Sequence, residues 1–247
     1  MTYGIIIPAR IGSTRFPEKP LALIHGKPMI VRTVESALKC VRDGFLGVCV
    51  ATDDHRIADA VSNAFPHQVS VVMTDPLLPN GTARCAAALS HLPWKSDIIV
   101  NLQGDEPFIE ASQVFSLLDC FSGDAFTAPT DIATLKIELA PEDLNNPNRV
   151  KVVCGIHGQA LYFSRSPIPF HRNPTTLKNF RHIGMYAYRT DILQTLSTLS
   201  ETPLEQAESL EQLRWLEHGL RIKVAETHHE SPSIDTPEDL EYLGARG

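Results

Sequence analysis

The sequence predicts an α/β protein built on a mixed sheet, with helices covering both faces in three layers. Short apolar runs alternate with amphipathic helical stretches in the first half, which is typical of parallel strands joined by right-handed crossovers. Beyond about residue 125, candidate strands follow one another without helices between them, which predicts antiparallel pairing. With 43% hydrophobic and 21% charged residues, the 247-residue chain can bury a sizeable core as one domain.

In the first half, each predicted strand is a short apolar run that a helix follows. The run Gly4–Pro8 lacks alternating polar residues and ends at a proline, as a strand buried on both faces does. Met29 and Val34 recur at helical spacing behind Pro28, and proline is favoured at the first helical position. The other predicted elements are strands Phe45–Ala51, Val69–Met73 and Asp97–Leu102, a helix from Asp53 or Asp54 to Ala64, and helices Thr82–Leu92 and Glu110–Phe121.

The second half is predicted to hold four strands, one long helix, a fifth strand and a final helix. The final helix begins with a capping box, in which Thr236 is the N-cap, Pro237 the first helical residue and Asp239 the reciprocal acceptor. The other predicted elements are strands Asp131–Glu138, Val150–Cys154, Ala160–Ser164 and His182–Arg189, helix Leu204–Gly219 and strand Arg221–Glu226.

Charge and cysteine content exclude several classes of protein. The formal net charge of −7 disfavours a nucleic-acid-binding surface. Five cysteines without a CxxC pair argue against a disulfide scaffold and against structural zinc. No stretch reaches the ~18–20 apolar residues of a membrane helix, and the first apolar run is too short for a signal peptide. We therefore expect a cytoplasmic protein without membrane insertion.

Cations gather in the loop after the first predicted strand. Arg10, Arg15 and Lys19 lie within ten residues, and Gly12 permits close approach of a ligand to the backbone. Ligands of open parallel sheets bind at the carboxyl ends of strands, where this loop lies. The loop is neither a Walker nor a dinucleotide motif. It predicts a site for a small anion, and the alternative is a solvated loop with incidental charges.

Two acidic residues are candidate magnesium ligands. Asp105 follows a predicted strand, so its carboxylate is expected in the same crevice as the cationic loop. A carboxylate beside phosphate groups requires a cation between them, which predicts Mg²⁺. Asp235 is the candidate second ligand, because Thr236 can cap the last helix in its place. The alternatives are a turn aspartate at 105 and a capping role for 235.

Nine sequence blocks resemble the sugar-acid cytidylyltransferases, and more closely their 3-deoxy-manno-octulosonate (KDO) branch. They follow in order along nearly the whole chain, and together they are specific. The blocks are IIIPARIGSTRFPEKPL, ATDD, NGTAR, VNLQGDEP, NPNRVKVV, ALYFSRSPIP, RHIGMYAYR, LEQLRWLEHG and IDTPEDLE. Three positions depart from the family pattern: Phe16 and Glu18 replace the commoner Leu and Gly, and Ala83 replaces a usual Glu, which leaves the role of Arg84 open.

The resemblance implies a Rossmann-like nucleotidyltransferase fold and an enzyme that transfers CMP from CTP to the anomeric hydroxyl of KDO. Pyrophosphate leaves, and the activated sugar serves lipopolysaccharide synthesis. Residues 1–125 and 222–247 would form the nucleotide-binding core. Residues 126–221 would form the sugar-binding and homodimer subregion of the same domain.

The resemblance also implies three sets of site residues. The nucleotide set is Ala9, Arg10, Arg15, Lys19, Thr74, Gly81, Thr82 and Arg84, with Arg10, Lys19 and Asp105 catalytic. The sugar set is Gln103, Arg165, His182, Tyr186, Glu208 and Glu211, and the metal set is Asp105 and Asp235 with Mg²⁺.

Three other functions remain open at this point. The acceptor could be another acid sugar, such as a sialic acid or an eight-carbon amino sugar. A catalytically inactive nucleotide-sensing module is a second alternative, although Lys19, Asp105 and Asp235 speak against it. A structural or nucleic-acid-binding protein is the third, and the net charge of −7 counts against it.

Overall fold

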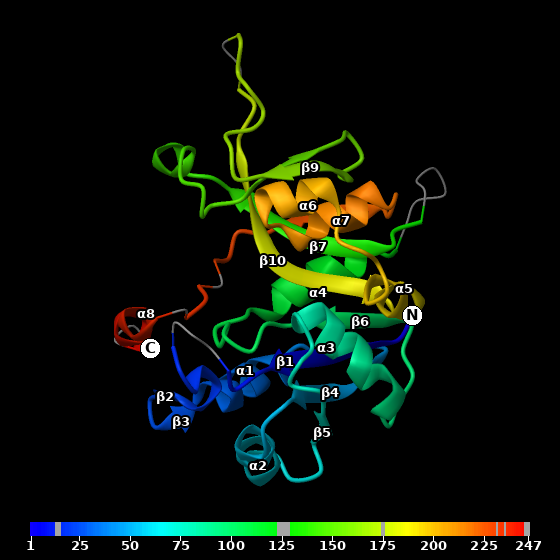
Figure 1. The fold of residues 1–247 in the computed structure, drawn as a ribbon, viewed down its shortest axis with the longest axis vertical. Helices are drawn as coiled ribbons and strands as arrows, with labels where there is room; N and C mark the ends of the chain where they lie inside the picture. The colour runs from blue at the N-terminus through cyan, green and yellow to red at the C-terminus, as the bar shows by residue number, and fades with distance from the viewer. Residues whose placement is uncertain (13–15, 123–128, 174–175, 231, 235, 245–247) are drawn as a thin grey trace. The chain divides into compact units, whose positions relative to one another are not determined.

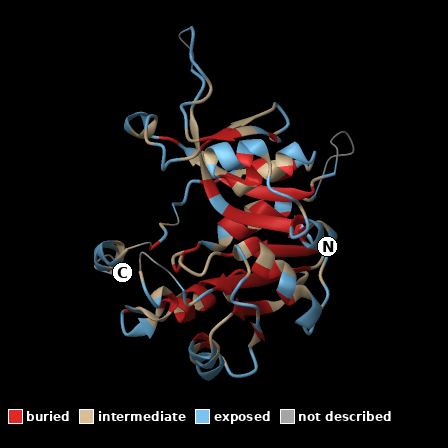
Figure 2. Ribbon diagram, viewed as in Figure 1, coloured by how far each residue is buried: buried red, intermediate tan, exposed pale blue. Residues whose placement is uncertain are grey.

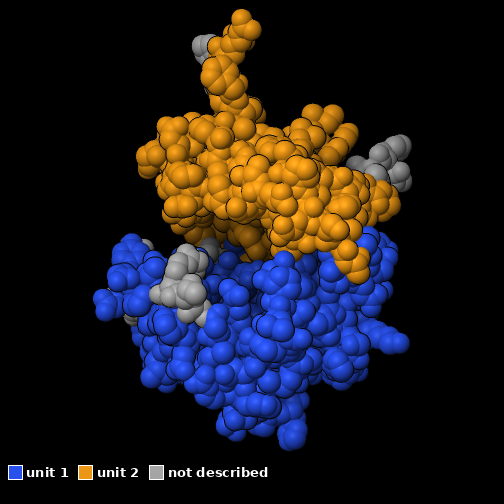
Figure 3. Space-filling model, in the orientation of Figure 1, with its two compact units in different colours: residues 1–114, 188–197, 231–247 blue, residues 115–187, 198–230 orange. Residues whose placement is uncertain are grey.

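The computed structural model describes residues 1–12, 16–122, 129–173, 176–230, 232–234 and 236–244. The chain forms two compact units (Figure 3). Unit 1 comprises Met1–Val114, Tyr188–Ser197 and Ser231–Gly247, and unit 2 comprises Phe115–Ala187 and Thr198–Glu230. These boundaries differ from the division expected from sequence, since residues 188–197 belong with unit 1 and residues 222–230 with unit 2.

Unit 1 is built on four parallel strands in the order β6 (Ile98–Asn101), β1 (Tyr3–Ala9), β4 (Phe45–Thr52) and β5 (Val69–Met73). All seven residues of β1 are buried, as the uninterrupted apolar run predicted (Figure 2). After β1 the chain adds β4 and then β5 on one side, and it returns to add β6 on the other side of β1. Ligands of such sheets bind where the order reverses, here between the ends of β1 and β6.

Helices α1 (Met29–Ala37) and α2 (His55–Ala64) pack against each other, and α3 (Gly81–Ala88) packs against α5 (Thr190–Leu196). Right-handed crossovers put these two pairs on opposite faces of the parallel strands (Figure 1). The short elements of unit 1 are η1 (Lys19–Leu21), β2 (Leu23–Ile24), β3 (Lys27–Pro28), η2 (Leu89–His91) and α8 (Pro237–Gly244).

The sequence located two helix starts correctly. Of the two aspartates before α2, Asp54 is the N-cap, and its side chain accepts from the Arg56 backbone N–H. At α8 the capping box is formed: Thr236 N donates to Asp239 Oδ2 at 2.9 Å, and Asp239 N donates to Thr236 Oγ1 at 3.2 Å. Pro28, expected as the first residue of α1, is instead its N-cap.

Unit 2 places β7 (Ile132–Glu138) between β10 (Phe180–Arg189) and β11 (Ile222–Glu226). Strand β8 (Lys151–Cys154) pairs antiparallel with β10 and with β9 (Ala160–Ser164), as predicted. Strand β11 pairs parallel with β7, so this part of the sheet is mixed. The remaining elements are η3 (Pro141–Asp143), α6 (Pro203–Glu208), α7 (Glu211–Glu217) and the part of α4 (Ala111–Asp119) from Phe115 onward.

The single long helix predicted over Leu204–Gly219 is wrong, because α6 ends at Glu208 and α7 begins at Glu211. Ser209 between them has φ 52°, a left-handed conformation that ends a helix. The carbonyls of Glu208 and Ser209 that this break leaves without helical partners accept from the Arg165 guanidinium, at 2.7 and 3.3 Å. The break is therefore stabilised by a residue from a distant strand end, which helical periodicity cannot reveal.

Within the residues described, no helix combines the length and the apolar character that crossing a membrane requires.

Candidate functional site

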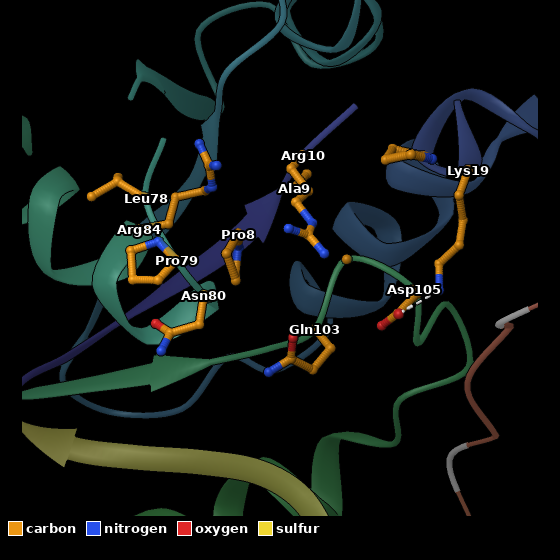
Figure 4. A pocket seen from close by; sticks show the side chains of 13 residues that line it. Pro8, Ala9, Arg10, Lys19, Leu78, Pro79, Asn80, Arg84, Gln103 and Asp105 are labelled. Atoms are coloured by element: carbon orange, nitrogen blue, oxygen red, sulfur yellow. Dashed lines mark hydrogen bonds and ion pairs between the residues drawn. The ribbon is translucent and has the colours of Figure 1, made fainter. Parts of the chain in front are cut away.

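A cavity of about 340 Å³ opens at the carboxyl ends of β1 and β6, and all of its lining residues belong to unit 1. Figure 4 shows Leu78, Pro79, Asn80 and Arg84 on one side of the β1 end and Lys19 with Asp105 on the other. The lining consists of Pro8, Ala9, Arg10, Lys19, Pro20, Leu78, Pro79, Asn80, Gly81, Arg84, Gln103, Gly104 and Asp105. It lies where the strand order predicts a ligand site.

Two glycines allow the walls of the cavity to approach β1. A Cβ on Gly104 would lie 2.9 Å from the Pro8 carbonyl oxygen, and a Cβ on Gly81 would lie 3.2 Å from the Pro8 ring. Gly104 therefore lets the loop after β6 run against β1, with Gln103 and Asp105 on either side of the contact. Gly81 lets the first turn of α3 reach the same place.

Lys19 and Asp105 form an ion pair at the edge of the cavity, with 2.6 Å between Nζ and Oδ2. Their side chains are 12% and 30% exposed, so both are open to a ligand. The Asp105 loop is fixed from α1, where Thr33 Oγ1 donates to the Gly104 carbonyl at 3.1 Å and Ser36 Oγ to the Pro107 carbonyl at 2.7 Å. These bonds make the carboxylate a positioned group on an ordered loop.

Arg84 and Asp53 form a second, more deeply buried ion pair, with 3.3 Å between Nη2 and Oδ2. Arg84 also donates to Thr74 Oγ1, and Asp53 Oδ1 accepts from the Ile11 backbone N–H at 3.0 Å. Burial lowers the pKa of Arg84, the Asp53 charge opposes that shift, and the nearby Arg10 adds to it. Arg84 is thus a buried cation beside a second cation.

Arg10 is exposed at the mouth of the cavity, and it makes no hydrogen bond or ion pair with the parts of the chain that the structure describes. Together with Lys19 and Arg84 it brings three guanidinium or ammonium groups to one opening. Asp53 and Asp105 each offset one of them. The cavity therefore combines an available cation with two paired ones, which suits a multiply charged anion.

The structure brings most of the predicted nucleotide residues together. Ala9, Arg10, Lys19, Gly81 and Arg84 line the cavity, and so do Gln103 and Asp105. Thr74 does not line it but holds Arg84, and Thr82 is buried in α3. Arg15 and Asp235 lie outside the described residues.

Sequence reasoning missed Asp53, Leu78, Pro79 and Asn80. Asp53 and Asn80 stand in the ATDD and NGTAR blocks of the family resemblance, but neither was assigned to the site, and the position of Asp53 after a strand predicts only a possible helix cap. Asn80 caps α3, its Oδ1 accepting from the Ala83 backbone N–H at 2.8 Å. The Ala83 departure does not displace Arg84, whose partners here are Asp53 and Thr74.

Two of the predicted sugar residues, His182 and Tyr186, belong to an aromatic group in unit 2. The His182 ring lies 4.9 Å from Phe163 and 5.5 Å from Tyr186, and Tyr186 packs edge-on against Trp215 at 5.0 Å between centroids. Burial, and secondly the Arg181 charge, lower the pKa of His182 to about 3. Burial, and secondly the Glu211 charge, raise the pKa of Tyr186. Near neutral pH both rings are uncharged.

The hydrogen bonds of Thr134 fix the tautomer of His182. The Thr134 hydroxyl has one proton, and the carbonyls of Ile183 and Met185 lie 3.1 and 2.9 Å from its oxygen. Since those acceptors take the proton, the hydroxyl accepts from His182 Nε2 at 2.9 Å. His182 Nδ1 is then an acceptor, suited to a hydroxyl donor and not to a carboxylate.

Arg165 and Glu208 act mainly on the backbone in this structure. The Arg165 guanidinium donates to the carbonyls of Glu208, Ser209 and Pro147. The two carboxylate oxygens of Glu208 accept from Ser164 Oγ at 2.6 Å and from the Arg165 backbone N–H at 2.8 Å. Both residues thus stabilise the break between α6 and α7, a role that the sequence did not indicate.

No group of three or more histidine, cysteine, aspartate or glutamate side chains that could hold a metal ion occurs among the described residues. Among the described residues that line the cavity, Asp105 is the one acidic side chain.

Comparison with known sequences identifies the family. Residues 4–222 match the cytidylyltransferase family. A 3-deoxy-manno-octulosonate cytidylyltransferase of Chlorobium chlorochromatii is 48% identical, and the match covers 97% of this chain and 94% of that one. An 8-amino-3,8-dideoxy-manno-octulosonate cytidylyltransferase of Shewanella woodyi is 44% identical, covering 100% of this chain and 98% of that one.

Solved structures agree with this relationship. CMP:2-keto-3-deoxy-manno-octonic acid synthetase complexed with CTP has a TM-score of 0.91 at 42% identity, covering 100% of this chain and 98% of that one. A 4-diphosphocytidyl-2C-methyl-D-erythritol synthase from Anaerococcus prevotii has a TM-score of 0.67 at 12% identity, covering 99% and 95%, and shows the shared fold alone. The predicted nucleotidyltransferase fold is therefore confirmed, and the chain belongs to the cytidylyltransferase family, in its 3-deoxy-manno-octulosonate branch.

Proposed function

We propose that the protein transfers CMP from CTP to the anomeric hydroxyl of KDO and releases pyrophosphate. One observation carries the proposal: Arg10, Lys19 and Arg84 meet at one cavity in a protein whose formal net charge is −7. Such a local concentration of cations favours a triphosphate. The relatives, which are named for KDO or for its 8-amino derivative, support the same donor and acceptor classes.

In this reaction the anomeric oxygen of KDO attacks the α-phosphorus of CTP, and the bond from that phosphorus to the pyrophosphate oxygen breaks. Negative charge grows on the leaving oxygen. Arg10 and Lys19 are proposed to donate to the phosphate oxygens and to stabilise that charge. Ala9, Thr74, Gly81, Thr82 and Arg84, with Arg15, are proposed to hold the nucleotide.

Asp105 and Asp235 are proposed to hold a magnesium ion. Mg²⁺ in phosphate-transferring sites is bound by one or two carboxylates, by water and by the substrate phosphates, and Asp105 fits that donor set. Ile234, one residue before Asp235 in sequence, donates its backbone N–H to the Asp105 carbonyl at 3.0 Å, which supports the pairing. Bound there, the ion would offset charge on the triphosphate.

The sugar acid is proposed to bind through Gln103, His182, Tyr186 and Glu211. The neutral His182 and Tyr186 suit the hydroxyl groups of KDO, and the Glu211 carboxylate can accept from them. Arg165 and Glu208 are proposed to contribute by shaping the backbone before Glu211.

Three further properties are proposed from the family relationship. The product would enter lipopolysaccharide synthesis, the protein would act in the cytoplasm, and it would be a homodimer. Exposed apolar side chains of unit 2 support the dimer, since Leu161, Phe170 and Leu177 are 60%, 89% and 57% exposed. The expected mass in solution is twice 27.3 kDa.

The test of the proposed reaction is release of pyrophosphate from CTP with MgCl₂ and one of three acids: KDO, its 8-amino-8-deoxy derivative and a sialic acid. We expect KDO to turn over fastest, and CTP to be preferred over UTP by about tenfold or more, because buried acceptors for the cytosine amino group lose their partner with uracil. Faster turnover of another acid would reject KDO and retain the enzyme class. No pyrophosphate with any acid would overturn the proposal.

The metal site has its own test. Asp105→Asn should abolish magnesium-dependent turnover and retain the melting temperature, because the side chain lies at the cavity edge. Asp59→Asn, at an exposed position of α2, is the matched control and should behave as wild type. Full activity of Asp105→Asn at millimolar Mg²⁺ would exclude this residue as a ligand.

A further inference from the structure

Asp53 lies at the meeting point of three strand ends, beside the cavity but outside its lining. It follows the last residue of β4, and Thr52 and Thr74 tie the ends of β4 and β5 together, since Thr74 Oγ1 donates to the Thr52 carbonyl at 3.1 Å. Its Oδ1 accepts from the Ile11 N–H in the loop after β1. Its Oδ2 pairs with Arg84 of α3.

Burial makes this arrangement rigid. The side chains of Asp53 and Arg84 are 6% and 3% exposed, so water cannot replace either partner. A carboxylate in that position must stay paired, and a guanidinium without it would be a buried, uncompensated charge. Asp53 therefore fixes two parts of the cavity at once: the backbone next to Arg10, and the guanidinium of Arg84.

Charge provides a second reason for a carboxylate here. The positive charge of Arg10 lies close enough to Arg84 to lower the pKa of Arg84. Two cations that repel each other move apart unless an anion holds one of them. Asp53 is placed to hold Arg84 and the Arg10 loop together before a triphosphate arrives.

We infer that Asp53 is a positioning residue for the nucleotide, acting through Arg84 and the Ile11 backbone without touching CTP itself. The inference rests on the proposed function, because it concerns the same cavity. A positioning role differs from a purely structural role in one respect: the CTP affinity lost when Asp53 is substituted must depend on the presence of Arg84.

A double-mutant cycle tests this dependence. Asp53→Asn keeps an oxygen for the Ile11 N–H and removes the charge opposite Arg84, Arg84→Gln removes the cation, and the double variant removes both charges. CTP affinity is measured by calorimetry with MgCl₂ present. We expect each single variant to bind CTP about tenfold more weakly or worse, and the double variant to be no more than about threefold weaker than the poorer single. The inference would be overturned if the double variant lost CTP affinity by the product of the two single losses. It would also be overturned if the CTP affinity of Asp53→Asn were within twofold of wild type.

Asp131 provides a matched control in unit 2. Its carboxylate also pairs with an arginine, Arg221, at 2.7 Å, and also accepts a backbone N–H, at 2.9 Å. Asp131→Asn should lower the melting temperature and leave CTP affinity within twofold of wild type. If it weakened CTP binding as much as Asp53→Asn does, the effect at Asp53 would be one of general stability, and the inference would fail.

Two further measurements cover the remaining outcomes. If Asp53→Asn does not fold, Asp53→Glu is the substitute, because it keeps the charge and displaces the guanidinium of Arg84 by the length of one methylene. Severalfold weaker CTP binding by Asp53→Glu supports the inference, and CTP binding equal to wild type contradicts it. CTP binding by the wild-type protein distinguishes failure of this inference from failure of the proposed function. If the wild-type protein and Asp53→Asn bind CTP equally well, only the role of Asp53 is rejected. If the wild-type protein does not bind CTP, the proposed function is rejected and this inference with it.

Discussion

Unit 1 directs Arg10 and Lys19 into an open cavity, whereas unit 2 directs Lys151 and Arg165 at its own backbone. Arg10 and Lys19 line the cavity, and Lys19 is paired but still accessible. In unit 2 the Lys151 side chain is fully buried and donates to the carbonyls of Asn146 and Arg165, at 3.0 and 2.5 Å. Arg165 in turn donates to three carbonyls. The unit 2 side chains proposed to bind the sugar are the neutral rings of His182 and Tyr186 and the carboxylate of Glu211.

The number of cations in a region therefore does not locate an anion-binding site. A cation that donates to carbonyls satisfies irregular backbone that secondary structure has left without partners. Only a cation with a free approach, or with a partner that a substrate can replace, is available to phosphate. We therefore expect that substituting a cavity cation of unit 1 reduces turnover, whereas substituting a backbone-bound cation of unit 2 reduces stability.

The largest effect is expected at Lys19. Lys19→Ala should reduce turnover at saturating CTP by about a hundredfold or more, because one donor to a developing oxyanion contributes about 3–4 kcal/mol. Lys27→Ala is the control, since Lys27 is an exposed lysine of unit 1 paired with Glu35. Steady-state kinetics of both variants decide the matter, and turnover of Lys19→Ala within threefold of wild type would show that this loop does not act on the phosphates.

Substitution of Lys151 should have the opposite effect, a loss of stability without a loss of CTP affinity. Lys151→Met leaves the carbonyls of Asn146 and Arg165 without their donor, which should lower the free energy of unfolding by about 2–3 kcal/mol. CTP affinity should stay within twofold of wild type. Urea denaturation and calorimetry measure the two quantities, with the exposed Lys27→Met as reference. A stable variant with weak CTP binding would reverse the assignment of cations to the two units.

His182 should make unit 2 sensitive to acid. Its pKa is about 3 in the folded protein and about 6.5 when unfolded, so the unfolded chain gains a proton first as the pH falls. This residue therefore destabilises the fold progressively below about pH 6.5, by at most about 2 kcal/mol between pH 7 and pH 5. His182→Gln should flatten the dependence of the urea midpoint on pH. Parallel curves for variant and wild type would mean that the ring protonates in the folded state.

The smallest effect is expected at Glu18, where glycine is commoner in the family. Its φ of 54° is left-handed, which costs a non-glycine residue about 1 kcal/mol. The carboxylate pairs with Arg56 at 2.5 Å, but both side chains are exposed and contribute little. Glu18→Gly should therefore retain or slightly increase the melting temperature, and Glu18→Ala should not increase it. A clear loss of stability in Glu18→Gly would show that the Arg56 pair outweighs the backbone strain.

The candidate site was only partly predictable from sequence. Arg10, Lys19, Gln103 and Asp105 follow strands, and the carboxyl ends of parallel strands meet at one edge, so their convergence could be expected. The partners of Arg165 and of Arg84 could not be predicted. The partners of the Arg165 guanidinium lie 18–44 residues away in sequence and those of the Arg84 guanidinium lie 10 and 31 residues away, and no local pattern selects one carbonyl, hydroxyl or carboxylate among many.

Sequence patterns alone predict the parallel pairing of the unit 1 strands, the antiparallel pairing of β8 and β9, and the capping box of α8. Each depends on local patterns: apolar runs, turn residues and a hydroxyl three residues from a carboxylate. The folded structure adds three features that these patterns do not contain: the break at Ser209, the neutral state of His182 and the pairing of Asp53 with Arg84. Those features depend on burial and on partners distant in sequence, because the free energy of a charge or a carbonyl is set by what surrounds it in space.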